Sequence, residues 1–196
     1  MSVIPEWFKI VYTLAVLAFV VIYWRRYGPA NFLWFSDIAF IGAAPAMWLE
    51  SPLAAGVLAC MVLLPEVLWN VDYVLRLILR RRITGLTEYM FDPTIPLWLR
   101  SVSLFHVPLP LVLLWLVAAY GYPAMSLAVT VAAGGLVLVL SFVFSSPGKN
   151  INWVYGLGRV QERLPRPLYL GLQYVGLVAF VFIPSHWLLG WLFPTG

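Results

Sequence analysis

Four side chains in this sequence are of the types that perform general-base and nucleophilic chemistry: Ser36, Asp37, Glu66 and His106. Each lies in a long apolar stretch, where an ionisable group is costly and normally faces a protein interior or a water-filled cavity. His106 is the candidate general base, and Ser36 or a water molecule is the candidate nucleophile. Asp37 or Glu66 would orient the histidine. Because adjacent helical residues do not face each other, Ser36 and Asp37 can meet His106 only if their helices pack together.

Six further polar residues are predicted to bind a substrate. The first two share the helix of Glu66, and the four-residue spacing from Glu66 to Asn70 places both side chains on one face. Two amides in the turn 150–153 would donate hydrogen bonds to a developing oxyanion. Two acids lie on the long connection that precedes the span of His106. These predicted substrate-binding residues are Asn70, Asp72, Glu88, Asp92, Asn150 and Asn152.

Prolines surround the candidate base. A proline removes the N–H group that would bond the carbonyl four residues earlier, so Pro110 frees the carbonyl of His106 and Pro108 frees that of Leu104. Irregular backbone at membrane depth is tolerated only where it is buried in protein or lines a cavity. The sequence therefore predicts loosened backbone beside His106, inside a helical bundle.

The composition indicates which elements must position these residues. The chain is 63% hydrophobic and only 10% charged, with a mean hydropathy of +0.91, whereas a soluble domain carries about a quarter charged residues. We therefore expect an all-α polytopic transmembrane helical bundle, formed as a single integral membrane domain over residues 1–196. About six spanning helices are predicted, each near the ~20 residues that cross the hydrocarbon. They cover roughly 7–24, 32–49, 53–75, 97–120, 125–144 and 168–192.

The basic residues predict the orientation of the bundle. Of the twelve lysines and arginines, all except Lys9 lie at alternate helix ends, and by the positive-inside rule those ends are cytoplasmic. Both termini are then outside, and the candidate polar residues gather in the cytoplasmic leaflet. The net charge of +4 reflects topology, so nucleic acid is not expected as a partner. We expect membrane lipids as partners and a bacterial inner (plasma) membrane location.

No sequence motif fixes a reaction. The chain has no P-loop, no GxSxG, HExxH or GxGxxG pattern and no paired CxxC. With one histidine in the inner half and the single cysteine, Cys60, in an apolar run, a metal site is not expected. No cofactor is implied by any motif.

Three short segments resemble the YwaF-like bacterial integral membrane proteins and the related animal transmembrane acyltransferases. They are residues 33–38 (LWFSDI), 104–106 (LFH) and 150–153 (NINW), within roughly residues 30–155. Ser36 stands where that group has a cysteine. The resemblance implies an enzyme that handles acyl groups in the membrane, with the histidine at a helix entry.

Three functions therefore stay open. The first is an intramembrane enzyme, an acyltransferase or hydrolase that acts on a lipid or acyl substrate in a polar pocket of the cytoplasmic leaflet. The second is a small-solute or proton-coupled transporter, with Glu66, Asp72 and His106 as the relay and the proline-broken helices as gates. The third is a non-catalytic membrane subunit or scaffold, whose polar groups only hold the helices together.

Overall fold

A computed structural model describes residues 3–156 and 163–194, so Arg159, one of the basic residues used for topology, lies outside the described residues. The described chain is helical and contains no strand, which confirms the predicted all-α bundle. Its longer elements are α1 (Glu6–Tyr27), α2 (Phe35–Trp48), α3 (Pro52–Leu79), α4 (Leu97–Val102), α5 (Leu109–Tyr120), α6 (Ser126–Phe144), α7 (Arg166–Leu177) and α8 (Ile183–Leu192). Short 3-10 turns are η1 (Pro29–Leu33), η2 (Glu88–Phe91), η3 (Ser103–His106) and η4 (Ile151–Trp153), and η6 (Val178–Phe182) is a π-helical turn.

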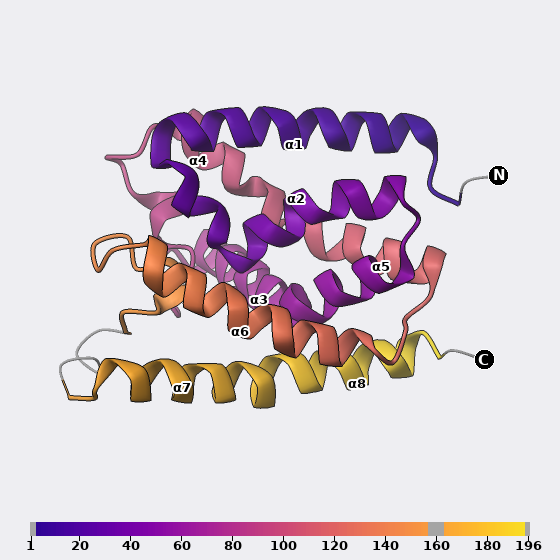
Figure 1. Ribbon diagram of the computed structural model, residues 1–196. Coiled ribbons are helices and arrows are strands. Elements are labelled where there is room, and N and C mark those ends of the chain that lie inside the picture. The colour runs from indigo at the N-terminus through magenta and orange to yellow at the C-terminus, as the bar shows by residue number, and fades with distance from the viewer. Residues whose placement is uncertain (1–2, 157–162, 195–196) are drawn as a thin grey trace.

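The helices run back and forth, and both ends of the chain lie at the same end of the bundle (Figure 1). Five stretches are long and apolar enough to cross a membrane: Glu6–Tyr27, Pro52–Leu79, Leu97–Tyr120, Ser126–Phe144 and Arg166–Leu192. The second expected span is shorter than predicted. Its α-helix has 14 residues, about 21 Å at 1.5 Å per residue, because η1 occupies the start of the segment.

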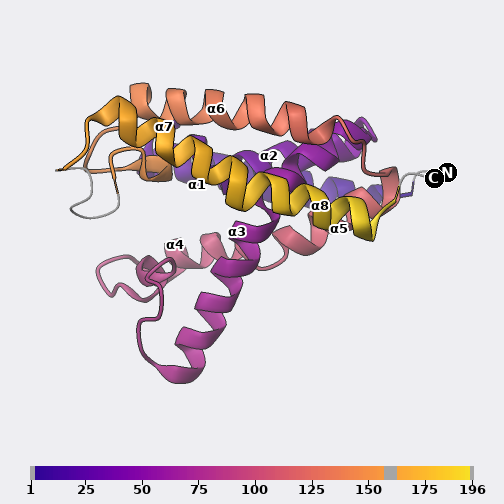
Figure 2. The same cartoon turned by 90° about the horizontal axis from the view of Figure 1, so that it is seen from below.

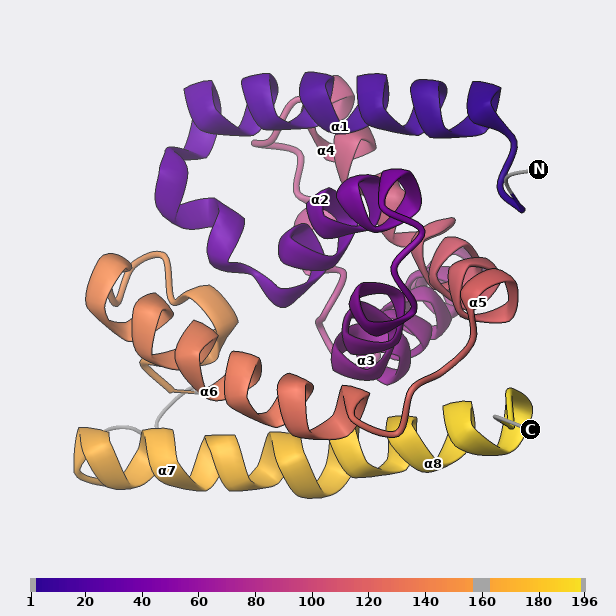
Figure 3. The ribbon, with the colours of Figure 1, turned by 45° about the vertical axis from the view of Figure 1, so that its right-hand side comes forward.

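The helix that carries Glu66, α3, is the centre of the bundle. It contacts α2, α5, α6 and α8, and these helices surround it in Figure 3. In its most apolar stretch 56% of the residues are buried, against 28% in α1 and 17% in α7–α8. Ser51 caps its first turn by accepting a hydrogen bond from the N–H of Ala54. Glu66, which is buried on this helix, is therefore enclosed by neighbouring elements.

The fourth expected span is broken at His106, as the prolines predict. The helix stops after α4, continues as η3, and resumes as α5. The carbonyl of Leu104, freed by Pro108, accepts a 3-10 hydrogen bond from the N–H of Val107 at 3.0 Å. The carbonyl of His106, freed by Pro110, accepts one from the side chain of Asn70 at 2.8 Å. The break thus exposes backbone acceptors, and a polar residue of α3 uses one of them.

The turn η6, which connects α7 and α8, packs closely against α6. A Cβ atom added to Gly134 of α6 would lie 2.6 Å from Cε2 of Phe182, whose side chain is fully buried in η6. The π-helical turn precedes Pro184, which has no N–H for the carbonyl of Phe180. The missing side chain at Gly134 lets this irregular turn pack directly on α6.

The outer surface of the bundle is apolar. Large hydrophobic side chains that are about half exposed or more include those of Leu14, Val71, Ile78, Leu136, Phe180 and Trp191. In Figure 2 the C-terminal half of α3 projects from the other helices, with α4 and the connection before it at that same side. Such a surface suits lipid and not water.

Candidate functional site

Glu66 of α3 and His106 of η3 form a buried pair. Nδ1 of His106 lies 2.8 Å from Oε2 of Glu66, and the two residues are 9% and 3% exposed. The two residues are 40 positions apart in the chain, so the contact depends on packing between α3 and the break before α5. Of the two acids expected to orient the histidine, Glu66 is the one in contact with it.

Asn70 holds the pair in place from one turn further along α3. Its Nδ2 donates to the carbonyl of Glu66 and to that of His106, both at 2.8 Å. Both donor hydrogens of the amide are therefore used on the backbone of the pair. Asn70, a predicted substrate-binding residue, positions the two helices here.

Aromatic rings enclose the imidazole. The ring of Trp69 stacks on it with centroids 4.5 Å apart, and that of Phe105 stacks at 4.2 Å. Phe40 of α2 stacks in turn on Phe105 at 4.6 Å. The ring plane of His106 is thus fixed by packing as well as by Glu66. Spacing gives a signal for Trp69, which follows Glu66 by three residues and so shares its face of the helix.

The second nitrogen of the imidazole is unused. Among the described residues Nε2 of His106 makes no hydrogen bond, and it is not one of the fully enclosed unpaired atoms. By contrast, Nε1 of Trp69 is fully enclosed, next to the hydroxyl group of Tyr89. A histidine has the arrangement of a general base when one ring nitrogen is bonded to a carboxyl group and the other is unbonded and not fully enclosed.

Asp37 is close to this pair but bonds elsewhere. It is 3% exposed and accepts a hydrogen bond from Nδ2 of Asn31 at 2.9 Å. The helix that carries Asp37, α2, does pack near the pair, since its Phe40 stacks on Phe105 next to His106. Ser36 is half-buried in the first turn of α2, and its side chain makes no hydrogen bond with any described residue. The structure therefore brings the helix of Asp37 and Ser36 against the pair, but no hydrogen bond connects either residue to Glu66 or His106.

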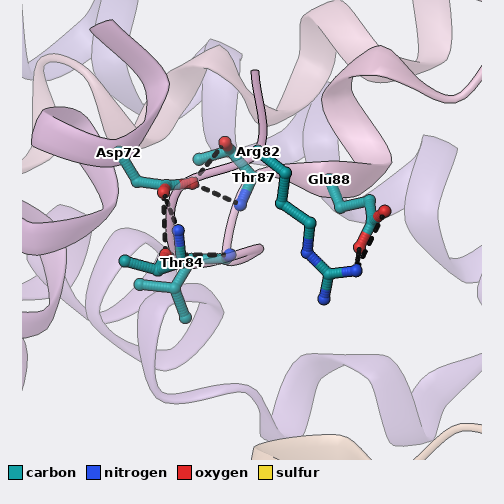
Figure 4. A network of polar contacts seen from close by, with 6 residues as sticks. Asp72, Arg82, Thr84, Thr87 and Glu88 are labelled. Carbon is teal, nitrogen blue, oxygen red and sulfur yellow. Dashed lines mark hydrogen bonds and ion pairs between the residues drawn. The ribbon is translucent and has the colours of Figure 1, made fainter. Parts of the chain in front are cut away.

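The carboxylate of Asp72 is hydrogen bonded to the loop that follows α3 (Figure 4). Its carboxylate accepts four hydrogen bonds, two from Thr84 and two from Thr87, at 2.6–3.1 Å. These bonds fasten the segment after α3 back onto the helix. Asp72, expected to bind substrate or to serve in a relay with His106, uses both oxygens on this loop.

The two acids of the connection also have local partners. Glu88 forms an exposed ion pair with Arg82 at 3.2 Å, which is visible in Figure 4. Asp92 accepts hydrogen bonds from Oγ1 and N of Thr94, and these bonds hold the pKa of its carboxyl group below the ordinary value. Neither residue is hydrogen bonded to the Glu66–His106 pair.

The amides of the 150–153 turn are used to hold backbone. Nδ2 of Asn152 donates to the carbonyl of Leu33 and to Oγ of Ser141, and its Oδ1 accepts from the N–H of Phe35. Asn150 closes its own loop by bonding the carbonyl of Gly156. These contacts join α6 to the start of α2. Asn152 thus uses both of its donor hydrogens and Asn150 uses one of two, and no hydrogen bond brings either amide to His106.

Two surface hollows lie away from the pair. One, of about 390 Å³, is apolar and is lined by Gly42, Ser51, Leu53, Ala54, Val57, Leu58 and Val129. The other, of about 460 Å³, is lined by Arg76, Leu77, Arg80 and Phe91 at the C-terminal end of α3. The second hollow could not be predicted from the sequence, because Phe91 lines it from η2 whereas its other lining residues belong to the end of α3.

Apolar spanning helices around a buried carboxyl–imidazole pair define this chain as an integral membrane protein with a polar interior. No family model, no curated protein and no solved structure matches the chain.

Proposed function

We propose that this protein is an intramembrane enzyme that cleaves or transfers an acyl group of a membrane-dissolved substrate, with His106 as its general base. The observation that carries this proposal is the state of the imidazole: Nδ1 is bonded to Glu66 at 2.8 Å and Nε2 is unbonded among the described residues. General-base action requires the tautomer in which Nδ1 donates its hydrogen to the carboxylate of Glu66 and Nε2 keeps its lone pair. Transmembrane acyltransferases, which the chain resembles in three short segments, perform related chemistry.

The simplest reaction that uses this pair is ester hydrolysis. Nε2 of His106 takes a proton from water while the water oxygen bonds to the ester carbonyl carbon. The C–O bond to the alcohol then breaks, and the departing oxygen takes that proton from Nε2. Glu66 holds the imidazole in position and stabilises its charged form during the step. Water is the nucleophile in this scheme because no hydrogen bond connects Ser36 to His106.

A second candidate is a structural clasp, in which the pair only holds α3 against the break before α5. Asn70 favours it, because this residue bonds the backbone at both Glu66 and His106. So do the two hollows, since neither is lined by a residue of the pair. Replacement of the pair by side chains that let the protein fold equally well distinguishes the two candidates. An enzyme would lose its activity, whereas a protein in which the pair is only a clasp would keep its function.

Lipid profiling of cells tests the enzymatic proposal. We expect cells that carry His106→Ala to accumulate the acyl substrate and to lack its product. His186→Ala is the matched control, since His186 is the second histidine of the chain and bonds Tyr122 at 2.8 Å. Equal membrane levels of both variants would be verified by immunoblotting. An unchanged lipid profile in the His106→Ala cells would remove the catalytic role.

The same proposal includes membrane lipids as substrates, the bacterial inner membrane as the location, and both termini outside. Eleven of the twelve basic residues support this orientation, because they occupy alternate helix ends. Reporter fusions at the two termini and after α3 test it. A reporter after α3 that is active outside the cell would reverse the orientation.

A further inference from the structure

The hollow at the C-terminal end of α3 carries two arginines. Arg76 and Arg80 line it together with Leu77 and with Phe91 of η2, around a volume of about 460 Å³. Arg80 directly follows the last residue of α3, so both arginines lie at the C-terminal end of this helix. Two positive groups thus border one concave site.

Arg76 is oriented by the aromatic wall of the hollow. Its Cζ lies 4.5 Å from the centre of the Phe91 ring, which is a cation–π distance. Its Nη1 is fully enclosed and has no hydrogen-bond partner among the described residues. Arg76 makes no side-chain hydrogen bond with any described residue, so the N–H groups of its guanidinium that border the hollow are available to a ligand.

Arg80 occupies a position where glycine is usual. It ends α3 in the left-handed conformation, with φ +53°, and its N–H bonds the carbonyl of Arg76 at 2.9 Å. Glycine is the usual residue at such a helix end because it has no Cβ to strain. An arginine here therefore has a strained backbone, and its side chain lines the hollow.

The nearby carboxylates do not neutralise these two arginines. Asp72 is bonded to Thr84 and Thr87, and Glu88 pairs with Arg82. Within the described residues neither Arg76 nor Arg80 forms an ion pair. Planar guanidinium groups that lack carboxylate partners are well suited to phosphate oxygens.

The surface beside the hollow is apolar. Leu77 is 51% exposed and Ile78 is 69% exposed, on the last turn of a membrane-spanning helix. We propose that this hollow binds a phosphate group, carried by an anionic phospholipid whose acyl chains lie along these side chains. Arg76 is ten residues from Glu66, about 15 Å along the helix. The site is therefore separate from the Glu66–His106 pair and does not depend on the proposed function.

Native mass spectrometry of the purified full-length protein tests this site. The protein is titrated with phosphatidylglycerol, with phosphatidylcholine and, in a separate arm, with glycerol 3-phosphate. We expect preferential retention of one phosphatidylglycerol, weakened about tenfold by Arg80→Gly or Arg76→Gln because each removes charge-assisted hydrogen bonds. Arg81→Ala is the matched control, since it removes one charge from the same segment but does not line the hollow.

Arg80→Gly separates binding from folding. Glycine relieves the left-handed strain at this helix end, so the variant should unfold at or above the temperature of the wild-type protein while it loses the lipid. Binding of glycerol 3-phosphate that depends on the same two arginines, without preference for phosphatidylglycerol, would support the phosphate site and assign its ligand to a soluble source. Wild-type retention of phosphatidylglycerol by Arg80→Gly and Arg76→Gln, or an equal loss in Arg81→Ala, would overturn the proposal.

Discussion

Replacement of the Glu66–His106 pair by apolar side chains should distinguish stability from function. Glu66→Leu leaves the imidazole buried without its partner, and His106→Phe does the same to the carboxyl group. The Glu66→Leu/His106→Phe double variant leaves neither a buried imidazole nor a buried carboxyl group without its partner. Phenylalanine also retains a ring that can stack on Trp69 and Phe105, where the imidazole has centroid distances of 4.5 and 4.2 Å.

The expected magnitudes follow from burial. The side chains of Glu66 and His106 are 4% and 11% exposed, so little water can replace a lost partner. Each single variant should lose about 3–5 kcal/mol of unfolding free energy, the usual cost of removing one member of a buried pair. The double variant should lie within about 1 kcal/mol of the wild-type protein, because apolar side chains of similar volume often replace a buried, hydrogen-bonded polar pair without loss of stability.

Unfolding free energies measured by steric trapping in bicelles provide the comparison. A corresponding cycle on Tyr122 and His186, whose hydrogen bond is also 2.8 Å long, serves as the reference. We expect a coupling of about 1 kcal/mol there, which is typical of a neutral hydrogen bond. Losses at Glu66 and His106 that simply add would show that the two side chains do not stabilise each other and would refute this reasoning.

Three smaller changes test other parts of the structure. Gly134→Ala places a Cβ 2.6 Å from the Phe182 ring and should cost about 1–3 kcal/mol by thermal unfolding, whereas Gly171→Ala has open space and should not destabilise. Asp72→Ala removes four hydrogen bonds and should cost about 2–4 kcal/mol, with faster hydrogen exchange at the amides of Thr84 and Thr87; unchanged exchange would contradict this. The lowered pKa of Asp92 means that its bonds to Thr94 are intact above the ordinary carboxyl pKa and are lost as pH falls through the lowered value. Protection of the Thr94 amide, which is its exchange rate relative to the intrinsic rate at each pH, should therefore fall there. Asp92→Asn should remove that pH dependence.

The spans and the helix break could be predicted because they depend on local sequence. Long apolar stretches indicate membrane helices, and Pro108 and Pro110 cannot supply the N–H groups that an unbroken helix needs. The spacing of Glu66 and Asn70 also placed both on one face, which is the face that contacts His106. The start of α2 was less predictable, since residues 32 and 33 of the predicted span 32–49 belong to the 3-10 turn η1.

Partner choice could not be predicted, because it depends on how helices pack. Two acids were equally plausible partners for His106, and only the packing of α3 against η3 selects Glu66 while Asp37 bonds Asn31. In the sequence Asp72 lies in a membrane span, but in the structure it accepts hydrogen bonds from the loop that follows its own helix. Asn152 reads as an oxyanion donor, yet its left-handed backbone turns the amide toward Leu33 and Ser141. These contacts join segments up to 119 residues apart.

Ester cleavage in lipid nanodiscs tests the central claim most directly. The purified wild-type protein, the Glu66→Leu/His106→Phe double variant and His186→Phe would be given phospholipid with a labelled acyl chain, and the release or transfer of that chain would be measured. We predict turnover by the wild-type protein and by His186→Phe, and none by the double variant even though it is folded. Equal turnover by the double variant, or no turnover by the wild-type protein on any acyl lipid of its native membrane, would contradict a catalytic role for the pair.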